Sequence, residues 1–260
     1  NLKSEFTKLE SKVLNIEGSH DFKLKVEDSE LAPRYLGAVI ENIEVKTSPD
    51  WLKNRLKAIG LSPINNVVDI TNYILHGLGQ PLHAFDADKI ADKTVKVGTV
   101  EAGTKFKTLD NVERTLNGSE IIIKDGKDNP MCIAGVFGGS ESGVSSETKT
   151  IFLESAYFNP VAIRKASKLH GLNTDASFRF ERGVDPNNAR TALTHAINLI
   201  QELAGGKLVG EILEHYPEKI KDHYVVFRYS KLDQILGIKI HREKVKEILK
   251  SLDIRILNEI

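Results

Sequence analysis

The sequence has little of what several common classes of protein require. Its 260 residues include a single cysteine, Cys132, so no disulfide can form within the chain. The apolar neighbours Met131, Ile133 and Ala134 predict that this thiol is buried in a protein of a reducing compartment. No apolar run approaches the roughly 18 residues of a membrane-spanning helix, and no signal peptide is visible. We therefore expect a soluble, cytoplasmic protein without membrane contact.

The chain also lacks an excess of either charge. Lys and Arg together number 36, as do Asp and Glu, so the formal net charge is zero. A protein that binds nucleic acid over its whole surface is usually basic, and any RNA contact here must use local patches. The sequence contains no P-loop, no G-x-S-x-G, no H-E-x-x-H and no clustered Cys/His set. We expect no metal site and no cofactor in this segment.

Length and composition are compatible with a medium domain and a smaller one, because 40% of the residues are hydrophobic and can form a sizeable core. Residues 1–32 are polar, and we expect them to be the trailing segment of a preceding domain. Residues 33–212 mix strands and helices without strict βαβ alternation, which predicts the α+β class with mixed and antiparallel sheets. Residues 213–260 are expected to begin a small helical, winged-helix-like domain. The sequence stops within this unit, so we expect a piece of a longer chain.

Alternating hydrophobicity and turn residues place the individual elements. Strands are expected at 22–26, 37–45, 96–100, 120–124, 131–137, 150–158 and 224–227. Helices are expected from Ser48, as N-cap, to Gly60, and then at 66–75, 159–171, 185–204, 230–237 and 241–252. The polar loop 125–129 predicts a hairpin between the strands on either side of it.

Glu154 is an acidic residue within the otherwise apolar stretch 151–158. A buried carboxylate without a partner is costly. Glu154 must therefore lie at a strand edge, pair with an arginine such as Arg179 or Arg182, or bind a ligand. The stretch 174–186 is dense in hydrogen-bonding groups, which fits either a site or helix capping with surface ion pairs. These local patterns leave the alternatives open.

His83 and a cluster of glycines also suit a small-molecule site. His83 follows Gly-Gln-Pro-Leu at 79–82, a segment that proline stiffens and glycine makes adaptable. Such a loop can present the imidazole to a ligand, or the imidazole can cap a nearby carbonyl. Gly135, Gly138 and Gly139 lack the spacing of a dinucleotide-binding fingerprint. They permit the close approach of either another backbone segment or a small ligand.

Five segments occur in the order found in bacterial-type phenylalanyl-tRNA synthetase beta subunits. They read N-V-V-D-I-T-N-Y at 66–73, G-Q-P-L-H-A-F-D at 79–86, A-G-V-F-G-G at 134–139, L-E-S-A at 153–156 and H-G-L-N-T-D-A-S at 170–177. From about residue 33 to its end, the chain resembles the central part of that subunit, which contains the editing domain.

The resemblance implies hydrolysis of tyrosine that has been attached by mistake to tRNA(Phe), in trans to the synthetic site. An apolar pocket shaped for phenylalanine discriminates against one added hydroxyl by only about a hundredfold. A second site that hydrogen-bonds the phenol reverses this preference, because phenylalanine leaves a buried polar group unpaired at a cost of roughly 1–3 kcal/mol. The implied partners are the acceptor end of tRNA(Phe), tyrosine and the alpha subunit of a heterotetramer, and ATP and Mg²⁺ serve the whole enzyme. The alternative is a non-catalytic module that binds tRNA or braces the subunits.

The resemblance also implies roles for residues of the amino-acid pocket. Glu154 matches the family residue that accepts the hydrogen bond of the phenol. Ala134 and Gly135 match the backbone wall of the pocket. Thr174 and Ala176 match positions that bound the pocket, where a larger side chain would exclude tyrosine.

The ester end of the substrate has its own matching residues. His83 matches the histidine that could hold water or the ribose, and it is the catalytic candidate. Thr71 and Asn72 match polar residues near the same end. Because no nucleophile–base pair is evident, we expect catalysis to consist mostly of positioning a water molecule. Ser62 stands where family members often carry an arginine, so the group that binds the terminal adenosine is not assigned.

Overall fold

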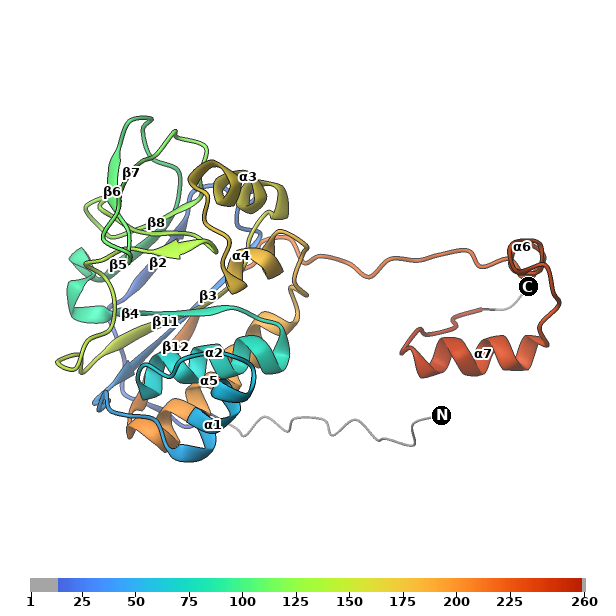
Figure 1. Cartoon of the computed structure of the whole chain (residues 1–260), viewed down its shortest axis with the longest axis horizontal. Helices are drawn as coiled ribbons and strands as arrows, with labels where there is room; N and C mark the ends of the chain where they lie inside the picture. The colour runs from blue at the N-terminus through green and yellow to red at the C-terminus, as the bar shows by residue number, and fades with distance from the viewer. Residues whose placement is uncertain (1–13, 259–260) are drawn as a thin grey trace. The chain divides into compact units, whose positions relative to one another are not determined.

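The computed structural model describes residues 14–258, which divide into two compact units between Lys219 and Ile220. Within residues 14–219 there are two five-stranded sheets, a two-stranded hairpin and several helices (Figure 1). The expected α+β class with mixed and antiparallel sheets is therefore confirmed. None of the helices in residues 14–258 has the length and apolar character needed to cross a membrane.

The first sheet is the centre of the larger unit. Its strands, in spatial order, are β1 (Ile16–Glu17), β12 (Lys207–His215), β3 (Arg34–Glu41), β11 (Ile151–Tyr157) and β4 (Leu82–Asp86). Strand β1 runs parallel to β12, and the remaining neighbours are antiparallel. Nearly every residue of β3 and β11 is buried, because apolar layers cover both faces of this sheet.

Helices cover one face of the first sheet. They are α1 (Asp50–Ala58), α2 (Asn66–Leu78) and α5 (Asn188–Ala204), which lie on the side away from the second sheet (Figure 1). Their apolar residues pack with Leu36, Ile40 and Leu153 of the sheet. The N-cap expected at Ser48 is wrong, because α1 begins one residue later with Pro49 as its N-cap. The Ser48 hydroxyl instead donates a hydrogen bond to Asp69 of α2.

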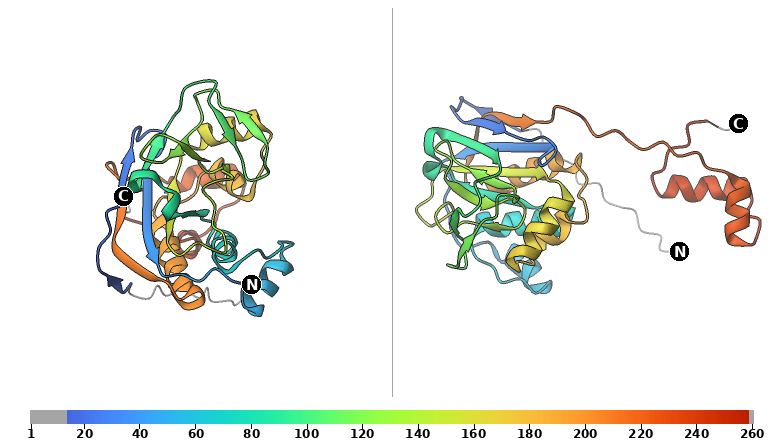
Figure 2. Two further views of the ribbon diagram at one scale, coloured as in Figure 1. Left: turned by 90° about the vertical axis from the view of Figure 1, so that its left-hand side faces the viewer. Right: turned by 90° about the horizontal axis from the view of Figure 1, so that it is seen from above.

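The second sheet faces the other side of the first. Its order is β10 (Phe137–Gly138), β9 (Pro130–Ile133), β8 (Ile122–Lys124), β5 (Thr94–Gly98) and β2 (Lys23–Val26). The hairpin expected around 125–129 is confirmed by the antiparallel pairing of β8 with β9. Two short 3₁₀ helices, η1 (Ala87–Lys89) and η2 (Ala91–Lys93), precede β5, and a separate hairpin joins β6 (Lys105–Lys107) to β7 (Glu113–Thr115). Figures 1 and 2 place α3 (Pro160–His170) and α4 (Asp175–Phe180) beside this sheet.

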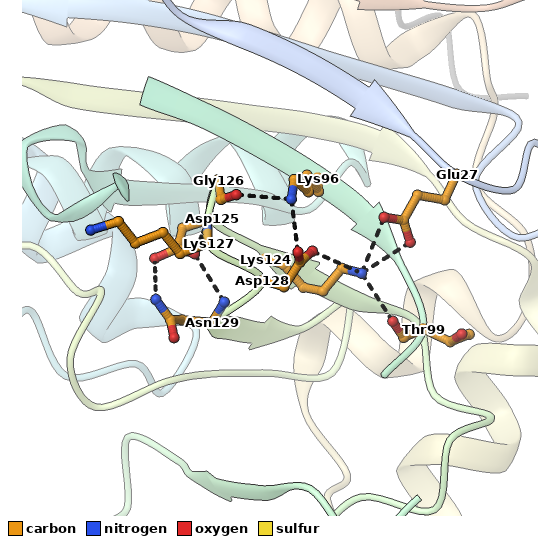
Figure 3. Close-up of polar contacts among 9 residues, drawn as sticks. All are labelled: Glu27, Lys96, Thr99, Lys124, Asp125, Gly126, Lys127, Asp128 and Asn129. Atoms are coloured by element: carbon orange, nitrogen blue, oxygen red, sulfur yellow. Dashed lines mark hydrogen bonds and ion pairs between the residues drawn. The ribbon is translucent and has the colours of Figure 1, made fainter. Parts of the chain in front are cut away.

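A charged cluster holds strand β2 to its neighbours (Figure 3). Lys124 of β8 is only 6% exposed, and its ammonium donates to the Glu27 carboxylate at 3.0 Å and to the Thr99 carbonyl at 3.1 Å. Asp128 lies 3.5 Å from the same ammonium and accepts a 2.9 Å hydrogen bond from Lys96 of β5. Because Glu27 follows β2 directly, the cluster ties β2 to both β5 and β8.

The described part of residues 1–32 belongs to the packing of the first unit. Residues 1–13 lie outside the described residues. Of the remainder, β1 pairs with β12, β2 pairs with β5, and Phe22 is buried in the core between the sheets. No break in packing therefore marks residue 32 within the described chain.

The second unit contains α6 (Tyr229–Leu236) and α7 (Arg242–Ser251), which confirms the two expected helices. The strand expected at 224–227 is wrong, since these residues pair with no strand in the part of the chain that is described. Tyr224, Val225 and Val226 are 82%, 83% and 82% exposed. An alternating segment without a neighbouring strand has no partner for its backbone hydrogen bonds.

Candidate functional site

The register of the first sheet places Glu154 and His83 side by side. Strand β11 lies between β3 and β4, and Glu154 pairs with Gly37 of β3 and His83 of β4. Directly opposed residues of antiparallel strands point to the same face of a sheet. Phe152 and Phe85, the next directly opposed pair on this face, are buried between the two sheets. Both Glu154 and His83 therefore face the second sheet.

Among the residues that the structure describes, Glu154 has one hydrogen-bond partner, the hydroxyl of Tyr35. Tyr35 is fully buried, and its Oη donates to Glu154 Oε2 at 2.7 Å. Burial raises the pKa of Glu154 to about 8, although the Tyr35 hydrogen bond acts in the opposite direction. The other carboxyl oxygen, Oε1, makes no hydrogen bond within residues 14–258. A mostly protonated carboxyl with one uncommitted oxygen thus lies in the core at neutral pH.

Two alternatives for Glu154 are excluded by these contacts. Its strand is internal to the sheet, so Glu154 does not lie at an edge. Arg179 and Arg182 each bind an acidic residue of their own segment, and neither contacts Glu154. The ligand-binding role of Glu154 stays a prediction.

His83 also contains an uncommitted polar atom. Its Nε2 is out of contact with solvent and has no hydrogen-bond partner among the described residues, so the carbonyl-capping alternative is excluded. The ring packs edge-on against Phe85 with centroids 4.4 Å apart. A Cβ added to Gly138 would lie 3.1 Å from His83 Cε1, so the backbone of β10 lies close to the imidazole. Burial lowers the pKa of His83 to about 4, which keeps the ring neutral at neutral pH.

The turn between β9 and β10 contains the two expected pocket-wall residues, Ala134 and Gly135. Gly135 has a φ of +65°, and a Cβ there would lie 2.8 Å from Phe180 Cδ2 and 3.1 Å from Ile163 Cδ1. Both the backbone conformation and the close approach therefore require glycine. Phe180 packs against Phe158 at 5.2 Å between ring centroids.

Further aromatic contacts connect this turn with the carboxyl group of Glu154. Phe158 packs against Tyr35 at 6.2 Å, and Tyr35 binds Glu154. A continuous row of side chains thus links the glycine turn to Glu154.

Thr174 joins this turn to helix α4. Its Oγ1 donates to the Val136 carbonyl at 3.0 Å and accepts from the Ser177 amide at 3.1 Å. In return, the Thr174 amide donates to Ser177 Oγ at 2.9 Å, which completes a capping box. Ala176, two residues further on, is partly buried against the core between the sheets. The predicted pocket residues Ala134, Gly135, Thr174 and Ala176 are thereby brought together.

Thr71 and Asn72 lie apart from this group on helix α2. The Thr71 hydroxyl donates to the Val68 carbonyl of its own helix, and the half-buried Asn72 makes no side-chain hydrogen bond within residues 14–258. His76, one turn after Asn72, contacts Arg179 of α4 at 3.2 Å, so this side of α2 faces the helix that Thr174 begins. No hydrogen bond joins Thr71 or Asn72 to Glu154 or His83 in the described chain. Their roles stay predictions.

Known proteins resemble this chain in sequence and in fold. Residues 31–205 match the model of the B3/4 domain family. The chain belongs to the B3/4 domain family. It is 51% identical over 239 residues to the phenylalanine–tRNA ligase beta subunit of Bacteroides fragilis (strain YCH46), covering 92% of this chain and 29% of that protein. It is 52% identical over 237 residues to the subunit of the same name from Porphyromonas gingivalis, covering 91% and 29%.

The resemblance to these beta subunits, based above on five segments, is confirmed, and this B3/4 domain chain spans less than a third of the length of both relatives. A crystal structure of an N-terminal fragment of the phenylalanyl-tRNA synthetase beta subunit from Pyrococcus horikoshii has a TM-score of 0.52 and 14% identity. The match covers 93% of this chain and 67% of that one. At this identity the likeness concerns the fold alone.

Two residues of the B3/4 domain site were missed by sequence reasoning. Tyr35 lies outside the strand expected at 37–45, and its link to Glu154, 119 residues away, depends on strand register. Gly138 was noticed as part of a glycine cluster, but its contact with His83 requires the hairpin to lie over β4. The T-x-x-S spacing of Thr174 and Ser177 was the one local signal for the start of α4.

A separate cleft of about 720 Å³ lies beside the β6–β7 hairpin and does not contain Glu154 or His83. Three lysines and three acidic residues line it, namely Lys89, Lys105, Lys107, Glu113, Asp125 and Glu141. This balance gives the cleft no preference for an anion or a cation. Within residues 14–258, no group of three or more His, Cys, Asp or Glu side chains is arranged to hold a metal ion.

Proposed function

We propose that this B3/4 domain is the editing site of a phenylalanine–tRNA ligase beta subunit and hydrolyses tyrosyl-tRNA(Phe) in trans to the synthetic site. The observation that carries the proposal is the pair of uncommitted polar atoms on one sheet face, Glu154 Oε1 and His83 Nε2. The names of the relatives, which are phenylalanine–tRNA ligase beta subunits, support the same function. The whole enzyme would act in protein biosynthesis in the cytoplasm, with ATP and Mg²⁺ used at a site outside this segment.

In this proposal, Glu154 is the residue that makes the site select tyrosine over phenylalanine. With a pKa of about 8, the carboxyl is mostly protonated at neutral pH. Its Oε1 therefore donates to the phenol oxygen, in place of the acceptor role that the resemblance implies, while Oε2 accepts from Tyr35. Phenylalanine offers no partner at this position. The unpaired buried group then costs roughly 1–3 kcal/mol, which corresponds to a preference of about tenfold to a hundredfold. The glycine turn, Thr174 and Ala176 bound the rest of the amino acid.

His83 positions a reacting group at the ester end of the substrate in this proposal. A base with a pKa of about 4 removes protons poorly at neutral pH, so the neutral Nε2 holds a water molecule or the ribose hydroxyl in place. The water oxygen attacks the ester carbonyl carbon, the bond between that carbon and the ribose oxygen breaks, and the ribose oxygen takes up the proton that the water loses. Thr71 and Asn72 are proposed to lie near this end. The acceptor end of tRNA(Phe) delivers the ester, and the alpha subunit completes the enzyme.

A binding experiment separates this proposal from a non-catalytic tRNA-binding or bracing module. The probe is an aminoacyl-adenosine analogue in which an amide replaces the ester, made with tyrosine and, as the matched control, with phenylalanine. At ten times its dissociation constant, a ligand stabilises the fold by about 1.4 kcal/mol. We expect the tyrosine analogue to raise the midpoint of thermal unfolding, the phenylalanine analogue to have little effect, and Glu154→Ala to abolish the difference. Equal or absent effects of the two analogues on the wild type would favour the bracing module.

A further inference from the structure

The hydroxyl of Tyr35 is committed to Glu154. Tyr35 belongs to β3, is fully buried, and packs its ring against Phe158. A phenylalanine would make the same ring contacts, so packing alone does not explain the hydroxyl. Its one hydrogen bond within the described chain is the 2.7 Å contact with Glu154 Oε2.

Among the described residues around Glu154, Tyr35 is the one whose side chain holds the carboxyl group by a hydrogen bond. The residue opposite Glu154 on β3 is Gly37, which has no side chain to restrain the carboxyl. The space above Gly37 is filled by the ring of Phe152, because a Cβ on Gly37 would lie 2.0 Å from Phe152 Cζ. On the other neighbouring strand, His83 makes no hydrogen bond to the carboxyl.

The titratable groups around the carboxyl come from three elements. They are Tyr35 of β3, His83 of β4 and Cys132 of β9 in the second sheet. The Cys132 thiol donates to the Ile133 and Phe137 carbonyls at 3.4 Å rather than to Glu154. Among the described residues, Tyr35 alone therefore fixes the orientation of the carboxyl group through a hydrogen bond.

We propose that Tyr35 is a positioning residue for tyrosine selection, which holds Glu154 Oε2 so that Oε1 alone meets the phenol of the substrate. This inference rests on the proposed editing function and adds a specificity residue to it. A carboxyl held at one oxygen presents the other in a fixed direction, so less ordering is required when the substrate binds. Loss of the hydroxyl also removes a contact that favours the ionised carboxyl.

The test uses the full-length ligase that contains this chain, with preformed tyrosyl- and phenylalanyl-tRNA(Phe) as substrates across pH 6 to 9. Tyr35→Phe is compared with the wild type, with Glu154→Ala and with the double variant. Tyr157→Phe is the matched control, because Tyr157 lies at the end of β11 and its hydroxyl makes no bond to Glu154. Circular dichroism verifies that each variant is folded.

We expect Tyr35→Phe to lower the tyrosine-over-phenylalanine rate ratio by about tenfold, as for the loss of one buried hydrogen bond. The midpoint of its pH dependence should move to higher pH, which a role in packing alone would not cause. In the Glu154→Ala background, where Tyr35 has no carboxyl to hold, the same change should have a smaller effect, because the two groups act as one unit. Tyr157→Phe should match the wild type.

Three results overturn the inference, and one of them also overturns the proposed function. A tyrosine-selective wild type whose ratio and pH midpoint are unchanged by Tyr35→Phe refutes the positioning role alone. An equal loss in the presence and absence of Glu154→Ala also refutes it, because Tyr35 would then act independently of the carboxyl. A wild type without tyrosine-selective hydrolysis overturns both proposals.

Discussion

Replacement of Glu154 by glutamine should remove the pH dependence of folding stability above neutrality. Glutamine has nearly the same size and can still accept the Tyr35 hydrogen bond. Burial raises the pKa of Glu154 to about 8 from an ordinary value of 4.5. The stability that follows from this raised pKa is fully present below pH 4.5 and is lost as the pH rises to about 8, because the unfolded chain releases the proton first. The difference between the two pKa values corresponds to a loss on the order of 5 kcal/mol.

His83 limits the pH window in which this loss is visible. Its folded pKa is about 4 against an ordinary 6.5, so its contribution is lost as the pH falls below 6.5. The two effects oppose each other between pH 4.5 and 6.5. Between pH 6.5 and 8 the contribution of His83 to stability no longer changes with pH, whereas that of Glu154 still falls. The wild type should therefore lose about 2 kcal/mol of unfolding free energy over this range.

Urea unfolding of the chain, followed by far-UV circular dichroism at pH 6.5, 7.3 and 8.5, measures this slope. Glu154→Gln should have a nearly flat profile and should be more stable than the wild type at pH 8.5. Glu202→Gln, at an exposed position of α5, is the matched control and should keep the slope of the wild type. The reasoning is refuted if Glu154→Gln retains the full slope, or if it is the less stable protein at pH 8.5.

Three further substitutions test separate parts of the site and its support. Gly138→Ala would place a Cβ 3.1 Å from the His83 ring, so we expect hydrolysis of tyrosyl-tRNA to fall by about tenfold or more. Gly143→Ala, whose Cβ would meet nothing closer than 3.6 Å, should retain the wild-type rate, and equal rates for both variants would contradict this account. Thr174→Val removes the cap of α4 and its bond to the glycine turn, and urea unfolding should show a loss of about 1–2 kcal/mol. Lys124→Met removes the ammonium that binds Glu27 and Asp128 in the cluster of Figure 3. Because both acids are partly exposed, we expect a loss of about 2 kcal/mol of unfolding free energy in the same assay. A more stable variant would argue against a role for the cluster.

Local signals predicted the described α-helices other than α4, because the groups that cap a helix are adjacent to it in sequence. The Asn159 side chain accepts from the amides of the first turn of α3, and Gly171 ends that helix with a φ of +65°. Helix α2 runs three residues past its expected end, because Gly79 rather than Gly77 adopts the left-handed conformation that ends it. The apolar stretch that predicted a strand at 150–158 likewise located β11 to within one residue at each end.

The site required information that no local pattern contains. Glu154 could be singled out as an acidic residue in an apolar strand, but its partner Tyr35 lies 119 residues away and depends on strand register. The same limit explains the strand wrongly expected at 224–227, because alternation does not say whether a partner strand exists. The contact of Thr174 with the turn after β9 also depends on the tertiary packing of α4.

The rate ratio for hydrolysis of preformed tyrosyl- and phenylalanyl-tRNA(Phe) tests the central claim most directly. The full-length ligase containing this chain would be measured as wild type, Glu154→Ala and His83→Ala. We predict a wild type that prefers tyrosine by tenfold or more, about the value of one buried hydrogen bond. Glu154→Ala should lose this preference, and His83→Ala should slow both hydrolyses. A Glu154→Ala enzyme that still prefers tyrosine as the wild type does would contradict the claim that this buried carboxyl recognises the phenol.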